Sequence, residues 1–174
     1  MLNENKIKLC FIGNPNVGKS TLINRLLNSN DLQTSELPGT TKKIIEKKLV
    51  WKEKEFIFLD TAGVYKKKDF NFNLLVKATR LSKIIILILD SSIKRLDKIH
   101  KKLVSHTLKA GKGLIIIFNK WDLINNKKEK KKELEEFIKY SVPQFDKRKL
   151  FFISALRDNN FLDILKFSLE IEKL

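Results

Sequence analysis

The feature that most constrains this chain is an eight-residue segment near its start, which runs from Gly13 to Ser20. It has the sequence GNPNVGKS and fits the pattern G-x-x-x-x-G-K-[ST] at every fixed position. An apolar run, residues 7–12, comes directly before it, and the apolar spacing over residues 22–27 predicts a helix directly after it. Glycines in such a loop let backbone N–H groups surround phosphate groups, and the helix N-terminus adds positive potential. The order strand, loop and helix therefore predicts a phosphate-binding P-loop.

Two side chains of this loop are expected to do most of its chemistry. Lys19 should reach the outer phosphates, and Ser20 should bind Mg²⁺. The residues that we expect around the phosphates are Gly13, Asn14, Pro15, Asn16, Val17, Gly18, Lys19, Ser20 and Thr21.

A second polar segment indicates which base accompanies the phosphates. Asn119, Lys120, Trp121 and Asp122 follow the apolar residues 114–118. An aspartate carboxylate can accept both N–H donors on the Watson–Crick edge of guanine, and adenine lacks that pair of donors. The segment thus favours a guanine nucleotide over ATP. After the last apolar run we expect Ser154, Ala155 and Leu156 to support the base.

Two further segments are expected at the γ-phosphate and its metal ion. Asp60 ends the apolar run 56–59 and should bind Mg²⁺ through water, while the Gly63 N–H should contact the γ-phosphate. The rest of this nucleotide-binding segment is Thr61, Ala62 and Val64. In the loop Pro38-Gly39-Thr40-Thr41, a threonine should close onto Mg²⁺ when triphosphate is bound, and both Thr40 and Thr41 remain open for that role.

The remaining pattern predicts an α/β fold. Buried strands are expected over residues 7–12, 56–59, 84–89, 114–118 and 150–153, with segments of helical spacing between them. Residues 43–51 alternate in polarity and lead through a turn into the next strand, which predicts an antiparallel edge strand. We expect a doubly wound, six-stranded, mostly parallel sheet with about five helices. The 174 residues, 43% hydrophobic and 32% charged, fit one domain over residues 1–174.

The composition of the chain limits the cellular compartment and the kinds of partner that we expect for it. The longest apolar run, residues 84–89, is too short for a membrane span, and the N-terminus lacks the pattern of a secretory signal. The single cysteine, Cys10, is expected to be buried and allows no intrachain disulfide, so we expect a cytoplasmic protein. The net charge of +16 would attract RNA or an anionic membrane surface, although lysine codons rich in A and T can also account for it. His100 and His106 are expected at the surface, without a metal.

With these motifs in place, the sequence resembles the translation-factor GTPases, and specifically the Der (EngA) ribosome-assembly GTPases, most closely in their second GTP-binding domain. The segments that carry the resemblance are GNPNVGKS, LPGTT, DTAGV and KAGKGLIIIFNKWDL. The resemblance implies a P-loop GTPase domain that hydrolyses GTP to GDP and acts as a switch in large-subunit biogenesis. The implied partners are a ribosomal particle or rRNA and no membrane; the chain would be a monomer or a nucleotide-dependent dimer. The catalytic residues that it implies are Lys19, Asn16, Thr40, Thr41 and Gly63.

The resemblance also has consequences at single positions. Val64 occupies the place where many small GTPases carry a water-orienting glutamine, so a side-chain amide cannot act there. In relatives with an apolar residue at that place, a bound K⁺ assists and is held partly by the asparagine that here is Asn16. K⁺-stimulated turnover is therefore expected. Family members usually carry two GTPase domains and a further RNA-binding-like domain, whereas this chain has one GTPase domain, which fits an excised domain or a reduced protein.

Other interpretations of the same motifs stay open. The G domain of a tRNA-modification protein shares the P-loop asparagine and the apolar residue after DTAG. A GTP-binding module that no longer hydrolyses would show the same binding motifs. A membrane-trafficking GTPase is disfavoured, because residues 171–174 contain no cysteine for prenylation.

Overall fold

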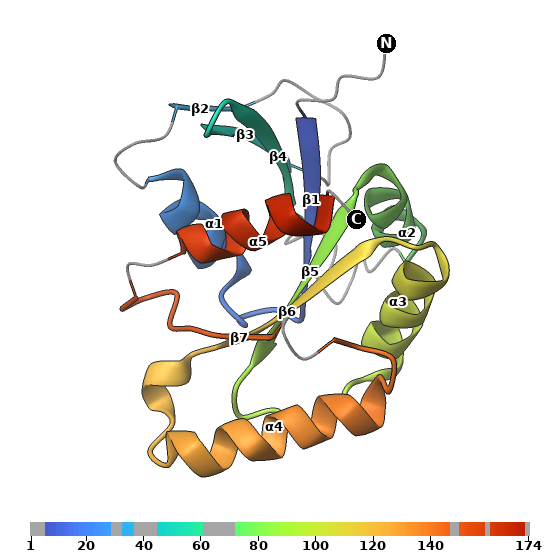
Figure 1. Ribbon diagram of the computed structural model, residues 1–174, viewed down its shortest axis with the longest axis vertical. Helices are drawn as coiled ribbons and strands as arrows, with labels where there is room; N and C mark the ends of the chain where they lie inside the picture. The colour runs from blue at the N-terminus through green and yellow to red at the C-terminus, as the bar shows by residue number, and fades with distance from the viewer. Residues whose placement is uncertain are drawn as a thin grey trace.

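The computed structural model describes residues 6–28, 33–36, 45–60, 72–146, 150–158 and 161–172. Strands and helices alternate along most of this chain (Figure 1). In chain order the elements are β1 (Lys6–Ile12), α1 (Lys19–Leu27), β2 (Gln33–Glu36), β3 (Ile45–Trp51), β4 (Lys54–Asp60), α2 (Phe72–Leu81), β5 (Ile84–Asp90), α3 (Lys98–Lys109), β6 (Gly113–Asn119), the 3₁₀ helix η2 (Trp121–Leu123), α4 (Lys127–Ser141), β7 (Leu150–Phe152) and α5 (Leu162–Glu172).

The strands form one sheet in the order β2-β3-β4-β1-β5-β6-β7. Strands β4, β1, β5, β6 and β7 are parallel to one another, while β3 runs antiparallel to β4 and β2 antiparallel to β3. Parallel strands are covered on both faces, which explains why β5 is apolar and buried along almost its whole length. The predicted doubly wound, mostly parallel α/β sheet is confirmed.

The sheet has one more strand than the six that the sequence predicts. Strand β2 pairs with β3 from Gln33–Val50 to Glu36–Lys47, so the predicted edge strand β3 is covered by a further strand. Its four residues, QTSE, are all polar. A strand without apolar residues gives no hydrophobic pattern to detect, and pairing with β3 alone defines it.

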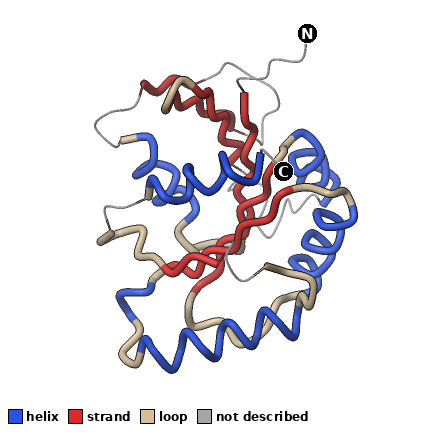
Figure 2. The backbone as a smooth tube through the Cα atoms, in the orientation of Figure 1, coloured by secondary structure: helices blue, strands red, loops and turns tan. Residues whose placement is uncertain are grey.

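Helices pack on both faces of the sheet (Figure 2). Helices α1 and α5 cover one face, where Phe11 and Phe58 meet edge to face with ring centroids 5.2 Å apart. Helices α2, α3 and α4 cover the other face, where Cys10 is buried as predicted. Each face thus has its own apolar core, and the parallel strands β1, β4 and β6 end at the same edge of the sheet.

Helix α3 corrects one prediction. Its buried face consists of His100, Leu103, Val104 and Thr107, which recur at helical spacing, and His100 is fully buried. The expectation of a surface histidine at this position is therefore wrong, because the helical register places His100 in line with Leu103 and Val104. His106 is half-buried.

No helix within the described ranges combines the length and the apolar character that crossing a membrane requires.

Candidate nucleotide-binding site

The loop between β1 and α1 depends on two glycines. Gly13 has φ +154° and Gly18 has φ +97°, and the second value is one that side chains rarely allow. A Cβ atom on Gly18 would lie 2.1 Å from Nδ2 of Asn119, and one on Gly13 would lie 2.3 Å from the carbonyl oxygen of Ile88. The loop therefore packs its backbone directly against the ends of β5 and β6, which leaves no room for a side chain at either position.

Lys19 lies inside this loop. Its Nζ donates hydrogen bonds to the carbonyl oxygens of Gly13 and Asn14, each at 2.8 Å, and only 5% of the residue is exposed. Burial lowers the pKa of Lys19 from 10.5 to about 8, although the nearby Asp60 carboxylate favours the charged form. The ammonium group is thus held by carbonyl oxygens of the same loop that is expected to bind phosphate.

Ser20, in the first turn of α1, lies next to Asp60 at the end of β4. The Ser20 hydroxyl lies 3.5 Å from Oδ2 of Asp60, which ends β4 and is 5% exposed. Hydroxyl and carboxylate oxygens are hard ligands of the kind that Mg²⁺ binds. The two oxygens fit the expected metal site.

Asn119 joins three segments that lie far apart in the sequence. Its Nδ2 donates to the carbonyl oxygen of Val17 at 2.7 Å, and its Oδ1 accepts from the N–H of Ala155 at 2.8 Å. Ser91 binds its carbonyl oxygen through both N–H and Oγ. Because Asn119 is 2% exposed, these bonds are made out of contact with water. This one side chain fixes the P-loop against the loop that follows β7.

A pocket of about 240 Å³ opens beside Asn119. Its lining combines the P-loop, the segment after β6 and the segment after β7, and consists of Asn16, Gly18, Thr21, Asn119, Lys120, Asp122, Leu123, Ser154, Ala155 and Leu156. A hydrogen bond from Ser154 lowers the pKa of the Asp122 carboxyl below its usual range, and Arg157 Nε lies 3.4 Å from Asp122 Oδ2. The carboxylate is therefore ionised at neutral pH and acts only as a hydrogen-bond acceptor.

Some predicted site residues point elsewhere. Trp121 is half-buried and packs against the apolar core with its ring centroid 4.8 Å from that of Phe152, and it does not line the pocket. Val17 is buried in the core beneath α1, and Asn14 donates to Oδ2 of Asp97 at 3.1 Å. Pro15 is exposed. Thr40, Thr41, Thr61, Ala62, Gly63 and Val64 lie outside the described residues.

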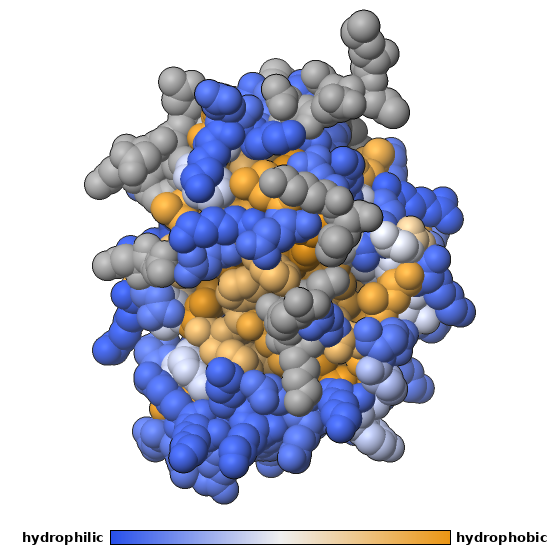
Figure 3. All heavy atoms as spheres, viewed as in Figure 1, coloured by the Kyte–Doolittle hydropathy of each residue, from blue (hydrophilic) through white to orange (hydrophobic). Residues whose placement is uncertain are grey.

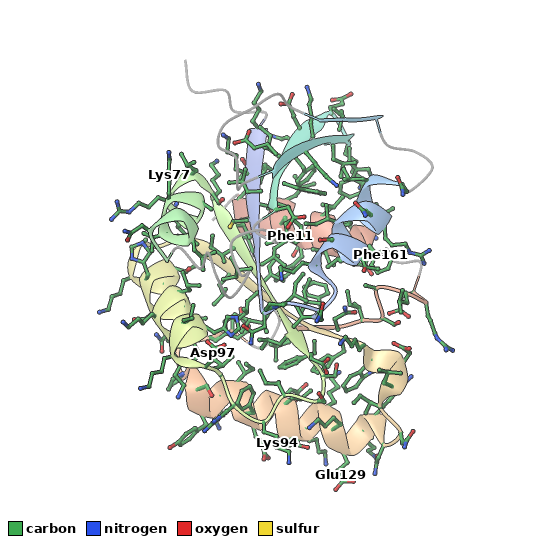
Figure 4. All side chains as sticks on the ribbon, turned by 180° about the vertical axis from the view of Figure 1, so that it is seen from behind. Phe11, Lys77, Lys94, Asp97, Glu129 and Phe161 are labelled. Atoms are coloured by element: carbon green, nitrogen blue, oxygen red, sulfur yellow. The ribbon has the colours of Figure 1, made fainter. Side chains whose placement is uncertain are left out.

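The structure adds residues that the motifs did not indicate. Asp90, at the end of β5, lies 2.7 Å from the ammonium group of Lys120, which has a left-handed backbone conformation with φ +63°. This ion pair anchors the base segment to the end of β5. Asp158 accepts from the N–H of Ser154 at 2.6 Å, which shapes the loop after β7. Asp97, labelled in Figure 4, caps α3 and contacts the P-loop. A carboxylate directly after an apolar run was the available signal for Asp90; Asp97 and Asp158 carried none.

Comparison with known proteins agrees with this geometry. The family model described as 50S ribosome-binding GTPase matches residues 8–120. GTPase Der of Buchnera aphidicola (subsp. Acyrthosiphon pisum, strain APS) is 36% identical over 172 residues, which are 95% of this chain and 37% of that protein. GTPase Der of Pelodictyon phaeoclathratiforme is 33% identical over 164 residues, covering 90% of this chain and 37% of that protein. The chain thus spans little more than a third of the length of these relatives.

Solved structures show the same fold. Era of Aquifex aeolicus bound to GDP and AlF₄⁻ superposes with a TM-score of 0.73 at 25% identity, covering 96% of this chain and 57% of that one. Era in complex with MgGDPNP and nucleotides 1506–1542 of 16S ribosomal RNA gives a TM-score of 0.72 at 26% identity, with the same coverage. Since the family model covers well over half of the sequence and includes the P-loop and Asn119, this chain belongs to the 50S ribosome-binding GTPase family.

Proposed function

We propose that this chain binds GTP, hydrolyses it to GDP and phosphate, and works as a nucleotide-dependent switch. The observation that carries the proposal is the position of Asn119, which joins the P-loop to both base-side segments around one pocket. The pocket is lined by the P-loop and by the ionised carboxylate of Asp122, which suits a ligand that carries both phosphates and a base with N–H donors. Family membership supports the same reaction.

Selection of guanine is assigned to Asp122. Its carboxylate lines the pocket, and it would accept the two N–H groups on the Watson–Crick edge of guanine. Adenine offers no such pair of donors to the carboxylate, so the hydrogen bonds that guanine would make are lost. Ala155 and Leu156, also in the lining, would cover the base, and Lys120 would lie along it from the opposite side of the pocket.

Binding of the phosphates is assigned to Lys19 and the backbone of residues 13–20. Mg²⁺ would be held by Ser20 and Asp60, whose oxygens already lie 3.5 Å apart, with Thr40 or Thr41 added in the triphosphate state. The ion would neutralise charge on the phosphate oxygens. The Gly63 N–H would sense the γ-phosphate, so the two segments that contain Thr40 and Gly63 would form the switch.

A monovalent cation is part of the proposal. Asn16 has φ +64°, is exposed and lines the pocket, so its amide oxygen can reach a ligand without competing with core contacts. With Val64 in place of a glutamine, K⁺ held by Asn16 would supply positive charge near the phosphates. Turnover should then be faster in KCl than in NaCl.

The biological setting that we propose is ribosome biogenesis. The relatives are named GTPase Der, and one structural neighbour is an Era complex with a 16S ribosomal RNA fragment. The net charge of +16 suits an RNA-containing partner. The matching alternative is the G domain of a tRNA-modification enzyme, which predicts no cofractionation with large ribosomal subunits.

The test is nucleotide binding by calorimetry with the Asp122→Ala variant. Two hydrogen bonds to a carboxylate contribute roughly 3–6 kcal/mol, so GDP affinity should fall about 10²-fold or more while ADP binding stays weak. The matched control is Asp163→Ala, which removes a half-buried aspartate of α5 outside the pocket lining and should bind GDP as the unmodified chain does. Equal affinity for GDP and ADP in the unmodified chain would refute the assignment.

Hydrolysis is tested separately. Phosphate release should be measured with GTP and Mg²⁺ in KCl and in NaCl, with Lys19→Ala as the inactive control. Binding without release in KCl would support the alternative of a non-hydrolysing module.

A further inference from the structure

A groove runs between α3 and the C-terminal end of α4, on a part of the surface that the nucleotide pocket does not use. Two adjoining hollows of about 370 and 420 Å³ form it, and they share Lys101 and Ser105. The first hollow lies between the two helices and includes Tyr140 and Gln144 near the end of α4, whereas the second is a shallow hollow lined by α3 alone, with Lys109 at its end. Figure 1 shows the end of α4 beside α3. None of the residues that line either hollow is acidic.

The groove is strongly basic because of the composition of α3. This twelve-residue helix contains four lysines and no acidic residue. Lys98, Lys101, Lys102 and Lys109 are all exposed and recur at helical spacing, so they lie along the outer face, opposite the buried His100. A row of ammonium groups on one helical face creates a positive potential that attracts a phosphate backbone.

Codon usage alone does not produce this distribution. Helix α5 has nearly the same length but contains one lysine and three acidic residues. Helix α4 contains many lysines but also four glutamates, and Lys130 is paired with Glu133. A uniform excess of lysine would place similar net charge on all three helices. The charge is instead concentrated on α3, beside the groove.

An exposed aromatic ring lies at the same groove. Tyr140 is 91% exposed. Of the large hydrophobic side chains that are exposed in the described part of the chain, it alone lines either hollow. The others, Leu81, Leu123 and Leu156, lie elsewhere. An accessible ring next to cationic side chains is the combination that binds single-stranded nucleic acid, since a base stacks on the ring while lysines contact the phosphates.

We propose that the α3–α4 groove binds single-stranded RNA, with Tyr140 stacking on a base and Lys101, Lys102 and Lys109 contacting phosphates. Only the choice of RNA as the partner rests on the proposed function; the groove and its charge do not. An unpaired strand is favoured over a duplex because stacking needs an unstacked base. A lipid surface fits less well, because the groove presents no exposed aliphatic side chain that would enter the acyl region.

The groove is separate from the nucleotide pocket. The two sets of lining residues have no member in common, so substitutions in the groove should leave GDP affinity unchanged. GDP binding therefore checks that each variant is folded, and it separates failure of this proposal from failure of the proposed function.

The experiment measures binding of a fluorescently labelled twelve-nucleotide RNA without secondary structure by anisotropy, at several salt concentrations. The test variant replaces Lys101, Lys102 and Lys109 by alanine. Loss of three phosphate contacts should reduce the slope of log K against log salt by about 2 and weaken binding by about tenfold to hundredfold at 0.1 M salt.

The matched control replaces three exposed lysines of α4, Lys127, Lys128 and Lys132, by alanine. This control removes the same charge from α4, whose outer side chains are mostly hydrophilic in Figure 3. The three lysines lie in the N-terminal part of α4, whereas only its C-terminal end lines the groove. The control should retain most of the RNA affinity and of the salt slope. Equal losses in the two triple variants would overturn the proposal, because general charge would then explain binding.

Tyr140 provides a test that does not depend on charge. Tyr140→Ala should weaken RNA binding at least about fivefold, while Tyr140→Phe, which keeps the ring, should bind as the unmodified chain does. Equal binding by the alanine and phenylalanine variants would overturn the stacking role. Vesicles containing phosphatidylserine and a duplex RNA are the competing ligands, and preference for either over the single strand would overturn the assignment of the partner.

Discussion

Replacement of Asn119 by alanine should destabilise the protein as well as weaken nucleotide binding. The Asn119 amide satisfies two buried backbone groups, the Val17 carbonyl at 2.7 Å and the Ala155 N–H at 2.8 Å. In the Asn119→Ala variant, neither group has this partner, and the side chain is too deeply buried for water to replace it without rearrangement. Loss of the link should loosen the P-loop relative to the loop after β7.

The expected magnitude follows from the number of bonds. A buried polar group that loses its hydrogen bond costs about 1–3 kcal/mol, so two such groups lower the free energy of unfolding by roughly 2–6 kcal/mol. With a urea m-value of about 2 kcal/mol/M, the unfolding midpoint should fall by about 1–3 M. Asn119→Asp keeps the acceptor for Ala155 but places a carboxylate oxygen against the Val17 carbonyl, so it should be at least as destabilising.

Urea denaturation of the nucleotide-free chain, followed by far-UV circular dichroism, measures this effect. The control is Asn125→Ala, an exposed asparagine in the turn before α4, which should change the unfolding free energy by less than about 0.5 kcal/mol. If Asn119→Ala unfolds at the same urea concentration as Asn125→Ala, Asn119 does not hold the two loops together, and the explanation of the pocket given above fails.

Two further predictions concern the P-loop and its neighbour. Burial lowers the pKa of Lys19 to about 8, so between pH 8 and 10.5 the unfolded chain binds more protons at this residue and the unfolding free energy should rise with pH by up to about 3 kcal/mol. Urea denaturation at pH 7.5 and 9.5 should show this rise in the unmodified chain and not in Lys19→Met; a rise that survives the substitution contradicts the assignment. Asp97→Ala removes the acceptor for the His100 N–H at 2.8 Å and should cost about 1–2 kcal/mol, whereas Asp97→Asn, which keeps a cap, should cost less; equal melting temperatures of the two variants would contradict this.

The fold and the ends of the pocket could be predicted because their signals are local. Gly18 and Lys19 occupy fixed places in a short motif, and each is required by backbone geometry or charge that any such loop shares. The apolar runs of β1, β5 and β6 likewise indicate buried parallel strands without reference to their partners. Asp122 was identified by its chemistry toward guanine and lies in the pocket lining.

The features that could not be predicted from the sequence depend on tertiary contacts. Trp121 is part of the same four-residue motif as Asp122, but within the 3₁₀ turn it packs on Phe152 at the edge of the core. His100 is buried because of its helical register, which residue type alone does not indicate. Strand β2 depends on pairing with β3, and the bond between Asn119 and Val17 joins residues 102 positions apart. Sequence patterns describe such residues one at a time, whereas their roles are set by the partner that the fold supplies.

The link through Asn119 also explains how the P-loop and the base segment are held together around this pocket. Strand β5 separates β1 from β6, so the P-loop and the base segment meet only across its end, where Gly18 leaves the space that Asn119 fills. Hydrogen bonds within the protein restrict both loops, and loops that are already restricted lose less freedom when a ligand binds. Substitutions should therefore separate into two kinds. Asp122→Ala should lower affinity for GDP with little change in stability, because its carboxylate serves the ligand, whereas Asn119→Ala should lower both, because its amide bonds are part of the fold.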